Sequence, residues 1–237
     1  MNLVANSNRS RGEKRRIKTR SAILDAAEDA FTELGYRGTR MEDISENADV
    51  AIGSIYSHFG SKDGLYSALV ERAVELFASY LEAAYNPDWS PLEQVIACGD
   101  AYLRFHIEHP GAFRFLAFNG VETGTPLIDP ELSARIDAKV AVIVEQFEAT
   151  VRQAIDAGEI RSSVDPELIS RFLWGAWNGT VALGLRNDSF FLSEDRIEMA
   201  IQQARRVVLE GLSAVGFRDV DGNSRAELRT VDSPRPE

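Results

Sequence analysis

Apolar residues recur at helical spacing along most of the chain, and no sustained apolar–polar alternation predicts a β-strand. The first amphipathic series is Ile23, Ala27, Ala30, Phe31 and Leu34. It predicts a helix that begins near residues 16–19 and ends at Gly35, a residue typical of helix C-termini. Residues 1–15 are polar and are predicted to be disordered. The whole pattern predicts an all-α fold of about nine helices.

Residues 39–65 predict two short helices joined by a tight turn. Thr39 and Glu42 have the spacing of a capping box, so a helix is expected over about 41–48. Asp49 and Val50 would form the turn, and a second helix is expected over about 52–59. Such a pair is typical of a helix-turn-helix, whose second helix enters the DNA major groove. A plain helical hairpin has the same periodicity, so spacing alone leaves both readings open.

A set of positions in and before this region occurs in a characteristic order: Arg20, Ala26-Ala27, Phe31, Gly35-Tyr36, Thr39, Ile44, Ala48-Asp49-Val50, Gly53 to Phe59, Ser61-Lys62-Asp63 and Leu65. Through these positions the region resembles the DNA-binding domain of the TetR family of bacterial transcriptional regulators. Three residues depart from the family pattern. Arg40 replaces a common Thr, Asp49 replaces the usual turn Gly, and Ala51 replaces the Ser that usually caps the second helix. Asp tolerates a left-handed backbone better than most residues, whereas Ala is a poor cap.

The outward face of the second helix and the basic residues around it are the candidate DNA contacts. The predicted contact residues are Arg20, Thr39, Arg40, Ile52, Gly53, Ser54, Tyr56, Ser57, His58 and Lys62. Gly53 lets the backbone approach a base or sugar, whereas Tyr56, His58 and Lys62 carry donors for phosphate oxygens. Arg16 is a further candidate near the start of the first helix.

The remainder of the chain predicts further helices between clear start and stop signals. The expected helices cover about 61–85, 91–109, 111–118, 130–157, 166–186 and 193–215, with a loop at 119–128. Pro follows the capping residue at Ser90, Asp129 and Asp165, which favours helix starts there. Gly158 and Gly216 are expected to end two of these helices. The predicted domains are a DNA-binding domain over 16–65, a helical effector and dimerisation domain over 66–216, and a disordered tail over 217–237.

Charge is distributed unevenly along the chain. The net charge is −11, yet residues 1–20 hold seven Lys or Arg and one Glu, a net of +6. This places positive charge where a phosphate backbone could meet it. With one cysteine, no secretory signal and no apolar run long enough to span a membrane, the protein is predicted to be cytoplasmic.

The resemblance implies that the second domain binds a small molecule and dimerises through its last two helices. Gly175, Gly179 and Gly184 lie on one of these helices and favour close helix packing, with room for a ligand as the alternative. Aromatic residues near polar groups are the candidate ligand contacts. They are Tyr102, Phe105, His106, Phe113, Phe115, Phe147, Trp174, Trp177 and Asn178. The expected effector is of medium size and largely apolar or aromatic.

The sequence contains no convincing metal-binding or catalytic motif. His106 and His109 lie three residues apart, but zinc needs three or four ligands at set spacing, so no metal and no cofactor are predicted. The sequence has no phosphate-binding Gly-Lys-Ser/Thr loop and no Gly-x-Ser-x-Gly elbow, so no enzyme is predicted. The leading hypothesis is a homodimeric, ligand-released repressor that binds a near-palindromic operator. One alternative is a helical ligand-binding or enzymatic protein with a degenerate helix-turn-helix. Another is a DNA-binding protein without an effector.

Overall fold

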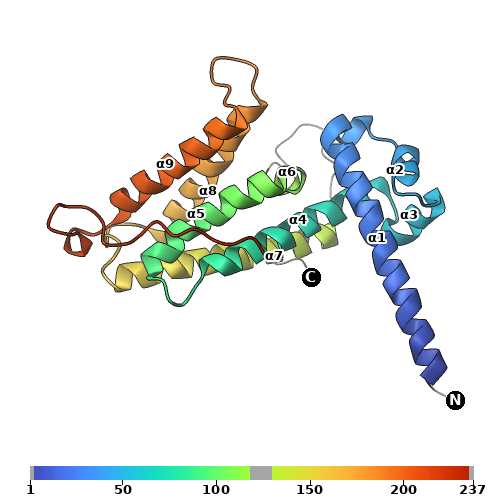
Figure 1. Cartoon of the computed structure of the whole chain (residues 1–237), viewed down its shortest axis with the longest axis horizontal. Helices are drawn as coiled ribbons and strands as arrows, with labels where there is room; N and C mark the ends of the chain where they lie inside the picture. Colours follow the sequence, from blue (N-terminus) through green and yellow to red (C-terminus); the bar gives the residue numbers. More distant parts are fainter. Residues whose placement is uncertain (1–2, 118–129, 235–237) are drawn as a thin grey trace. The chain divides into compact units, whose positions relative to one another are not determined.

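The computed structural model describes residues 3–117 and 130–234 (Figure 1). These residues form nine α-helices and two short 3-10 helices, and no β-strand occurs among them. The all-α prediction is therefore confirmed. The helices are α1 (Leu3–Gly38), α2 (Met41–Asn47), α3 (Ile52–Phe59), α4 (Lys62–Ala84), α5 (Pro91–Glu108), α6 (Pro110–Ala117), α7 (Pro130–Asp156), α8 (Pro166–Ala182) and α9 (Glu194–Leu212). The loop predicted at 119–128 and the cap predicted at Asp129 lie outside the described residues.

The chain divides into two compact units, each with its own packing. One unit comprises residues 1–74 and 110–136, and the other comprises residues 75–109 and 137–237. This division differs from the predicted domains, because α6 packs with the helix-turn-helix unit. Phe115 of α6 contacts the rings of Phe31 and Tyr66, at centroid distances of 6.5 and 5.2 Å. The aromatic side chains of α6 complete the core of that unit.

Helix α1 begins much earlier than predicted. The structure places residues 3–15 in a helix, so a disordered arm over 1–15 is wrong for these residues. Arg, Lys and Glu are good helix formers, and extending an existing helix avoids the unfavourable nucleation step. At the other end, Gly35 leaves the helical conformation with φ +70°, and one further turn follows as far as Gly38. Gly35 thus provides the predicted break.

The second unit contains α5, α7, α8 and α9, with residues from the end of α4. Ser90 and Glu93 form the predicted capping box, with both reciprocal hydrogen bonds present. Asp165 caps α8 by accepting the Leu168 backbone N–H at 3.0 Å. An apolar core joins α5, α7 and α9. Its buried members are Leu92, Val95, Ile96, Val151, Ala154, Ile160, Leu209, Leu212 and Ala226.

The C-terminal part of the chain differs from the prediction in two ways. Helix α9 ends at Leu212, so Val215 lies outside it and is 83% exposed. The chain beyond residue 217 is ordered as far as Pro234 and packs on the second unit, where Val231 is 1% exposed. The disordered-tail prediction is wrong for these residues. Composition alone suggested it, whereas two apolar side chains and several backbone hydrogen bonds hold this segment in place.

None of the helices in the described part of the chain is both long and apolar enough to cross a membrane.

Candidate nucleic-acid interface

The turn between α2 and α3 is closed by a left-handed residue. Asp49 has φ +51° and is the one non-glycine residue with positive φ among the described residues. The Val50 N–H donates to the Ser45 carbonyl at 3.0 Å, and the Asp49 N–H donates to the Glu46 carbonyl at 3.1 Å. This pair of bonds is a Schellman motif, which terminates α2 and redirects the chain into α3. The prediction that Asp serves at the usual glycine position is confirmed.

Helix α3 begins without a side-chain cap. Ala51 occupies the N-cap position with extended backbone, and its carbonyl accepts the Ser54 N–H at 2.8 Å. A Ser or Asp at this position would also accept a backbone N–H from the first turn. As expected from Ala51, the α3 N-terminus lacks that contact.

One face of α3 is buried and the other is open to solvent. Ile55 is fully buried, whereas Ile52 and Tyr56 are 36% and 47% exposed. Gly53 and Ser57 are exposed, and Ser54 and His58 are half-buried. Positions 52, 53, 56 and 57 are exposed as the helical spacing predicted, whereas Ser54, also predicted to point outward, is half-buried.

Basic side chains from α1 lie close to the end of α3. Arg20 is exposed, and its guanidinium lies 5.3 Å from the centre of the Phe59 ring. The pKa of His58 is lowered from 6.5, first by burial and then by the positive charges of Arg16 and Arg20. Arg40 is also exposed and lies 3.9 Å from the Glu42 carboxylate. The end of α3 therefore has a local positive potential suited to a phosphate.

Two predicted contact residues are used inside the domain instead. Thr39 is 2% exposed, and its hydroxyl donates to the carbonyls of Ala30 and Gly35. It forms no capping box, because the N-cap residue of α2 is Arg40. The Lys62 ammonium donates to the Thr39 carbonyl at 2.6 Å and lies 4.5 Å from the centre of the Tyr36 ring. Burial also lowers the pKa of Lys62. Both residues thus join α1 to the starts of α2 and α4.

Several candidate ligand residues gather in the second unit. Tyr102 and Trp174 have ring centres 5.7 Å apart, and the Tyr102 hydroxyl donates to the Asn178 side-chain oxygen. Phe105 is fully buried beside them. The centre of the cluster is Phe77 of α4, whose ring lies 5.9 Å from Tyr102, 5.4 Å from Phe105 and 5.8 Å from Trp174.

Phe77 is not among the ligand contacts predicted from the sequence. It lies four residues after the buried Ala73 of α4, so helical spacing could have identified it.

The five remaining candidates have different surroundings. Trp177 is 8% exposed and lies against Gly99 of α5. His106 is half-buried on α5, and burial lowers its pKa. Phe147 packs instead on the apolar core of α5, α7 and α9. Phe113 is buried in the other compact unit, as is Phe115. The residues that the structure brings together are thus Tyr102, Phe105, Trp174 and Asn178.

The sequence matches two family models in succession. Residues 23–69 match the model for bacterial regulatory proteins of the tetR family, and residues 95–207 match the tetracyclin repressor-like C-terminal domain. The chain belongs to the TetR family of bacterial transcriptional regulators. The helix-turn-helix of a TetR-family regulator is its DNA-binding domain, so α3 is the recognition helix.

Individual TetR-family members show the same relationship. The regulator RutR of Escherichia coli strain K12 is 25% identical over 207 residues, which cover 81% of this chain and 90% of RutR. The regulator UidR of the same strain is 27% identical over 168 residues, covering 69% and 80%. The crystal structure of PfmR from Thermus thermophilus superposes with a TM-score of 0.65 at 24% identity. That superposition covers 81% of this chain and 95% of PfmR, and it supports the fold.

Proposed function

We propose that this TetR-family chain is a homodimeric repressor that binds a near-palindromic operator and is released by a small, mostly apolar effector. DNA binding is supported by the exposed outer face of α3, which lies beside basic residues of α1. Ile52, Gly53 and Ser54 would contact base edges, whereas Tyr56, Ser57 and His58 would contact phosphates with Arg20 and Arg40. Thr39 and Lys62 would act only by holding the helices in place.

An exposed apolar stripe on α8 supports the dimer. Leu168 and Phe172 are 67% and 64% exposed, and Gly175 and Gly179 continue the same face at helical spacing. A side chain at either glycine would meet no atom within 4 Å in the single subunit. Exposed apolar side chains next to glycines suit close approach of a second helix, so we assign this stripe to the partner subunit. Gly184 differs, since it packs on Ile197 of its own subunit.

The aromatic cluster supports an apolar effector. Tyr102, Phe105 and Trp174 provide ring surfaces, while Asn178 provides a fixed polar group, which is the usual composition of a small-molecule site. His106, Trp177, Phe113 and Phe147 are less direct candidates. The effector would release DNA only if it bound one separation of the two recognition helices more tightly than the other.

Selection of bound fragments from a random DNA pool tests the DNA part. A two-fold symmetric motif with half-sites about 34 Å apart is the expected result, because two recognition helices enter successive major grooves. Recovery of no motif would favour the alternative, a helical ligand-binding or enzymatic protein with a degenerate helix-turn-helix.

Tryptophan fluorescence tests the effector part. The chain has three Trp, and a Trp89→Phe variant leaves only Trp174 and Trp177 as reporters. Apolar or aromatic ligands are expected to quench this emission and to raise the melting temperature. Quenching only by small, highly charged metabolites would contradict an apolar site.

A further inference from the structure

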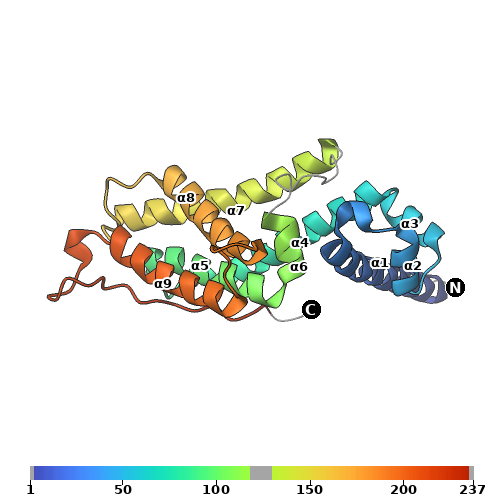
Figure 2. The ribbon, with the colours of Figure 1, turned by 90° about the horizontal axis from the view of Figure 1, so that it is seen from above.

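The chain after α9 returns along α5 as an extended segment, drawn in dark red in Figures 1 and 2. We call residues 226–234 the C-terminal strap. Ala226 is 8% exposed, Val231 is 1% exposed, and Leu228 packs against the core of α5, α7 and α9. The matched family model ends at residue 207, so the strap is not part of the region that defines the family.

Side chains of α5 and α9 bind main-chain groups of the strap at alternate positions. The Glu93 carboxylate accepts the Glu227 N–H at 2.9 Å, and the Asp100 carboxylate accepts the Val231 N–H at 2.9 Å. Between them, the Arg205 guanidinium donates to the Arg229 carbonyl. A spacing of two residues is that of an extended chain. Helix side chains thus perform the role that a neighbouring strand performs in β-strand addition.

The surface on which the strap lies contains a buried ion pair. Arg205 and Asp100 are 1% and 2% exposed, and they pair at 2.6 Å. Arg205 also donates to the Gln202 side-chain oxygen at 2.7 Å and to the Ile96 carbonyl at 3.4 Å. A buried ion pair is stable only if its remaining donors and acceptors are satisfied. The strap supplies one acceptor to Arg205 and one donor to Asp100.

Two side chains of the strap also contact this surface, so the surface should prefer some peptide sequences over others. The Arg229 guanidinium pairs with Glu93 at 3.1 Å and lies 5.9 Å from the centre of the Trp89 ring. Val231, two residues later, is almost fully buried. The site therefore fits an extended peptide with a basic residue followed at the second position by a compact apolar one.

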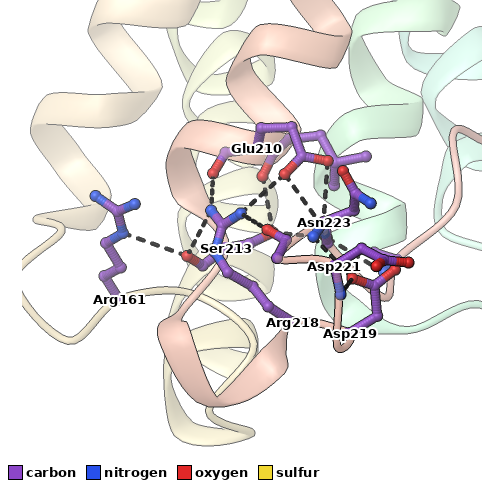
Figure 3. A network of polar contacts seen from close by, with 11 residues as sticks. Arg161, Glu210, Ser213, Arg218, Asp219, Asp221 and Asn223 are labelled. Atoms are coloured by element: carbon purple, nitrogen blue, oxygen red, sulfur yellow. Dashed lines mark hydrogen bonds and ion pairs between the residues drawn. The ribbon is translucent and has the colours of Figure 1, made fainter.

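The strap is joined to α9 through a separately anchored turn, shown in Figure 3. Arg218 pairs with Glu210 at 3.0 Å and donates to the Gly222 carbonyl at 2.6 Å. Val220 at the tip is fully exposed, and Gly222 has φ +85°. The Ser224 N–H also donates to the Glu210 carboxylate, so the turn is anchored up to Ser224. Residues 226–234 can therefore detach without unwinding the end of α9.

We propose that the surface between α5 and α9 is a peptide-binding site, and that the C-terminal strap is its resident and exchangeable ligand. Its detachment would remove one hydrogen-bond acceptor from Arg205 and one donor from Asp100, and it would weaken the packing of α5 on α9. Helix α5 carries Tyr102 and Phe105 of the aromatic cluster. Strap occupancy therefore regulates the second unit independently of DNA binding.

The test uses the full chain with a specific protease site inserted after Val220. After cleavage, the C-terminal fragment is expected to co-elute with the protein. A fluorescently labelled synthetic peptide of residues 223–237 should then exchange into the site and give saturable anisotropy. A Val231→Asp peptide is expected to bind at least tenfold more weakly, whereas a Thr230→Ala peptide should bind normally because Thr230 is exposed. Loss of the fragment without peptide binding, or equal binding of all peptides, would overturn the proposal.

A second measurement needs no cleavage. In the intact chain, Val231→Asp is expected to speed tryptic cleavage at Arg225 and Arg229 at least tenfold, and Thr230→Ala is not. Equal cleavage rates in both variants and the wild type would also overturn the proposal.

Discussion

Gly53 lies on the open face of α3, where the backbone itself is accessible. A Cβ added there meets no atom within 4 Å, and the residue has an ordinary helical conformation. Alanine is about 1 kcal/mol more favourable than glycine inside a helix. Gly53 therefore weakens α3 without any packing requirement in the free protein, which suggests that close approach to DNA is what needs it.

Gly53→Ala is accordingly expected to change stability and DNA affinity in opposite directions. The free energy of unfolding should rise by about 0.5–1 kcal/mol, because the helix gains propensity. Affinity for the selected operator should fall at least tenfold, and base preference should change, because the methyl group separates the backbone from the bases. Thermal unfolding and quantitative DNA binding measure the two effects. Unchanged operator binding would show that DNA does not approach this position.

Tyr56→Phe should act differently from changes at Gly53. Tyr56 is 47% exposed, and its hydroxyl is a candidate phosphate donor. Losing one hydrogen bond to a charged group corresponds to about 1.5–3 kcal/mol, so binding should weaken about tenfold or more for every DNA sequence. Repeating the fragment selection with the variant is the measurement. A changed consensus at unchanged overall affinity would contradict the assignment of Tyr56 to phosphate.

His58 should make DNA binding dependent on pH. Burial and the charges of Arg16 and Arg20 lower its pKa from 6.5, so the free folded protein disfavours the protonated form and loses stability as pH falls below that value. A phosphate at the same place would raise the pKa again, so binding takes up a proton. Operator affinity should therefore rise as pH falls from about 7.5 to about 5.5.

The control for this pH dependence is His58→Gln, which removes the titrating group and keeps a donor. Its operator affinity should vary less with pH than that of the wild type. If both proteins show the same slope, another group is responsible for the proton uptake.

At the scale of single elements, local sequence rules predicted much of the fold. The left-handed Asp49, the weak cap Ala51 and the capping box at Ser90 were all correctly identified, because each depends on residues within one turn. Thr39 was misassigned for the opposite reason. Its hydrogen bonds reach back nine residues to Ala30 of α1, and spacing within a helix gives no sign of such a contact.

The C-terminal strap and the Arg205–Asp100 pair escaped prediction for the same reason. Arg205 interacts with a carboxylate 105 positions earlier in the chain. On a helical wheel, an isolated arginine beside apolar residues is indistinguishable from one at the edge of the exposed face. The polar composition of residues 217–237 likewise suggested disorder, although Val231 and Leu228 are enough to fix part of this segment on the core.

Gly64, at the start of α4, has no room for a side chain, in contrast to Gly53. A Cβ on Gly64 would overlap the carbonyl oxygen of Phe59, the last residue of α3. Gly64→Ala should therefore lower the free energy of unfolding by about 1–3 kcal/mol, as overpacking usually does. Gly53→Ala in the same unit is the matched control, since it should raise stability. Similar melting temperatures for both variants would show that α4 shifts freely at this point.

At the scale of the whole molecule, binding of the proposed two-fold symmetric operator would need two recognition helices held at a fixed separation. A two-fold symmetric dimer brings the same surface patch of both subunits together. Each contact between two residues of the patch therefore occurs twice, once in each direction across the interface. The exposed stripe of Leu168, Phe172, Gly175 and Gly179 has the small and apolar character expected of such a patch. Since no charge interrupts these four positions, one introduced carboxylate should be highly disruptive.

Phe172→Asp is expected to convert a dimer into a folded monomer. The substitution places an unpaired charge in each half of the interface, and burying such a charge is strongly unfavourable. Light scattering gives the mass, and circular dichroism confirms retained helicity. Operator affinity should fall at least a hundredfold, because each half-site then binds on its own. Val142→Asp, at another exposed apolar position on α7, should remain a dimer with normal affinity. If the Phe172→Asp protein kept the dimer mass and bound the operator normally, the subunit interface would lie on a different face.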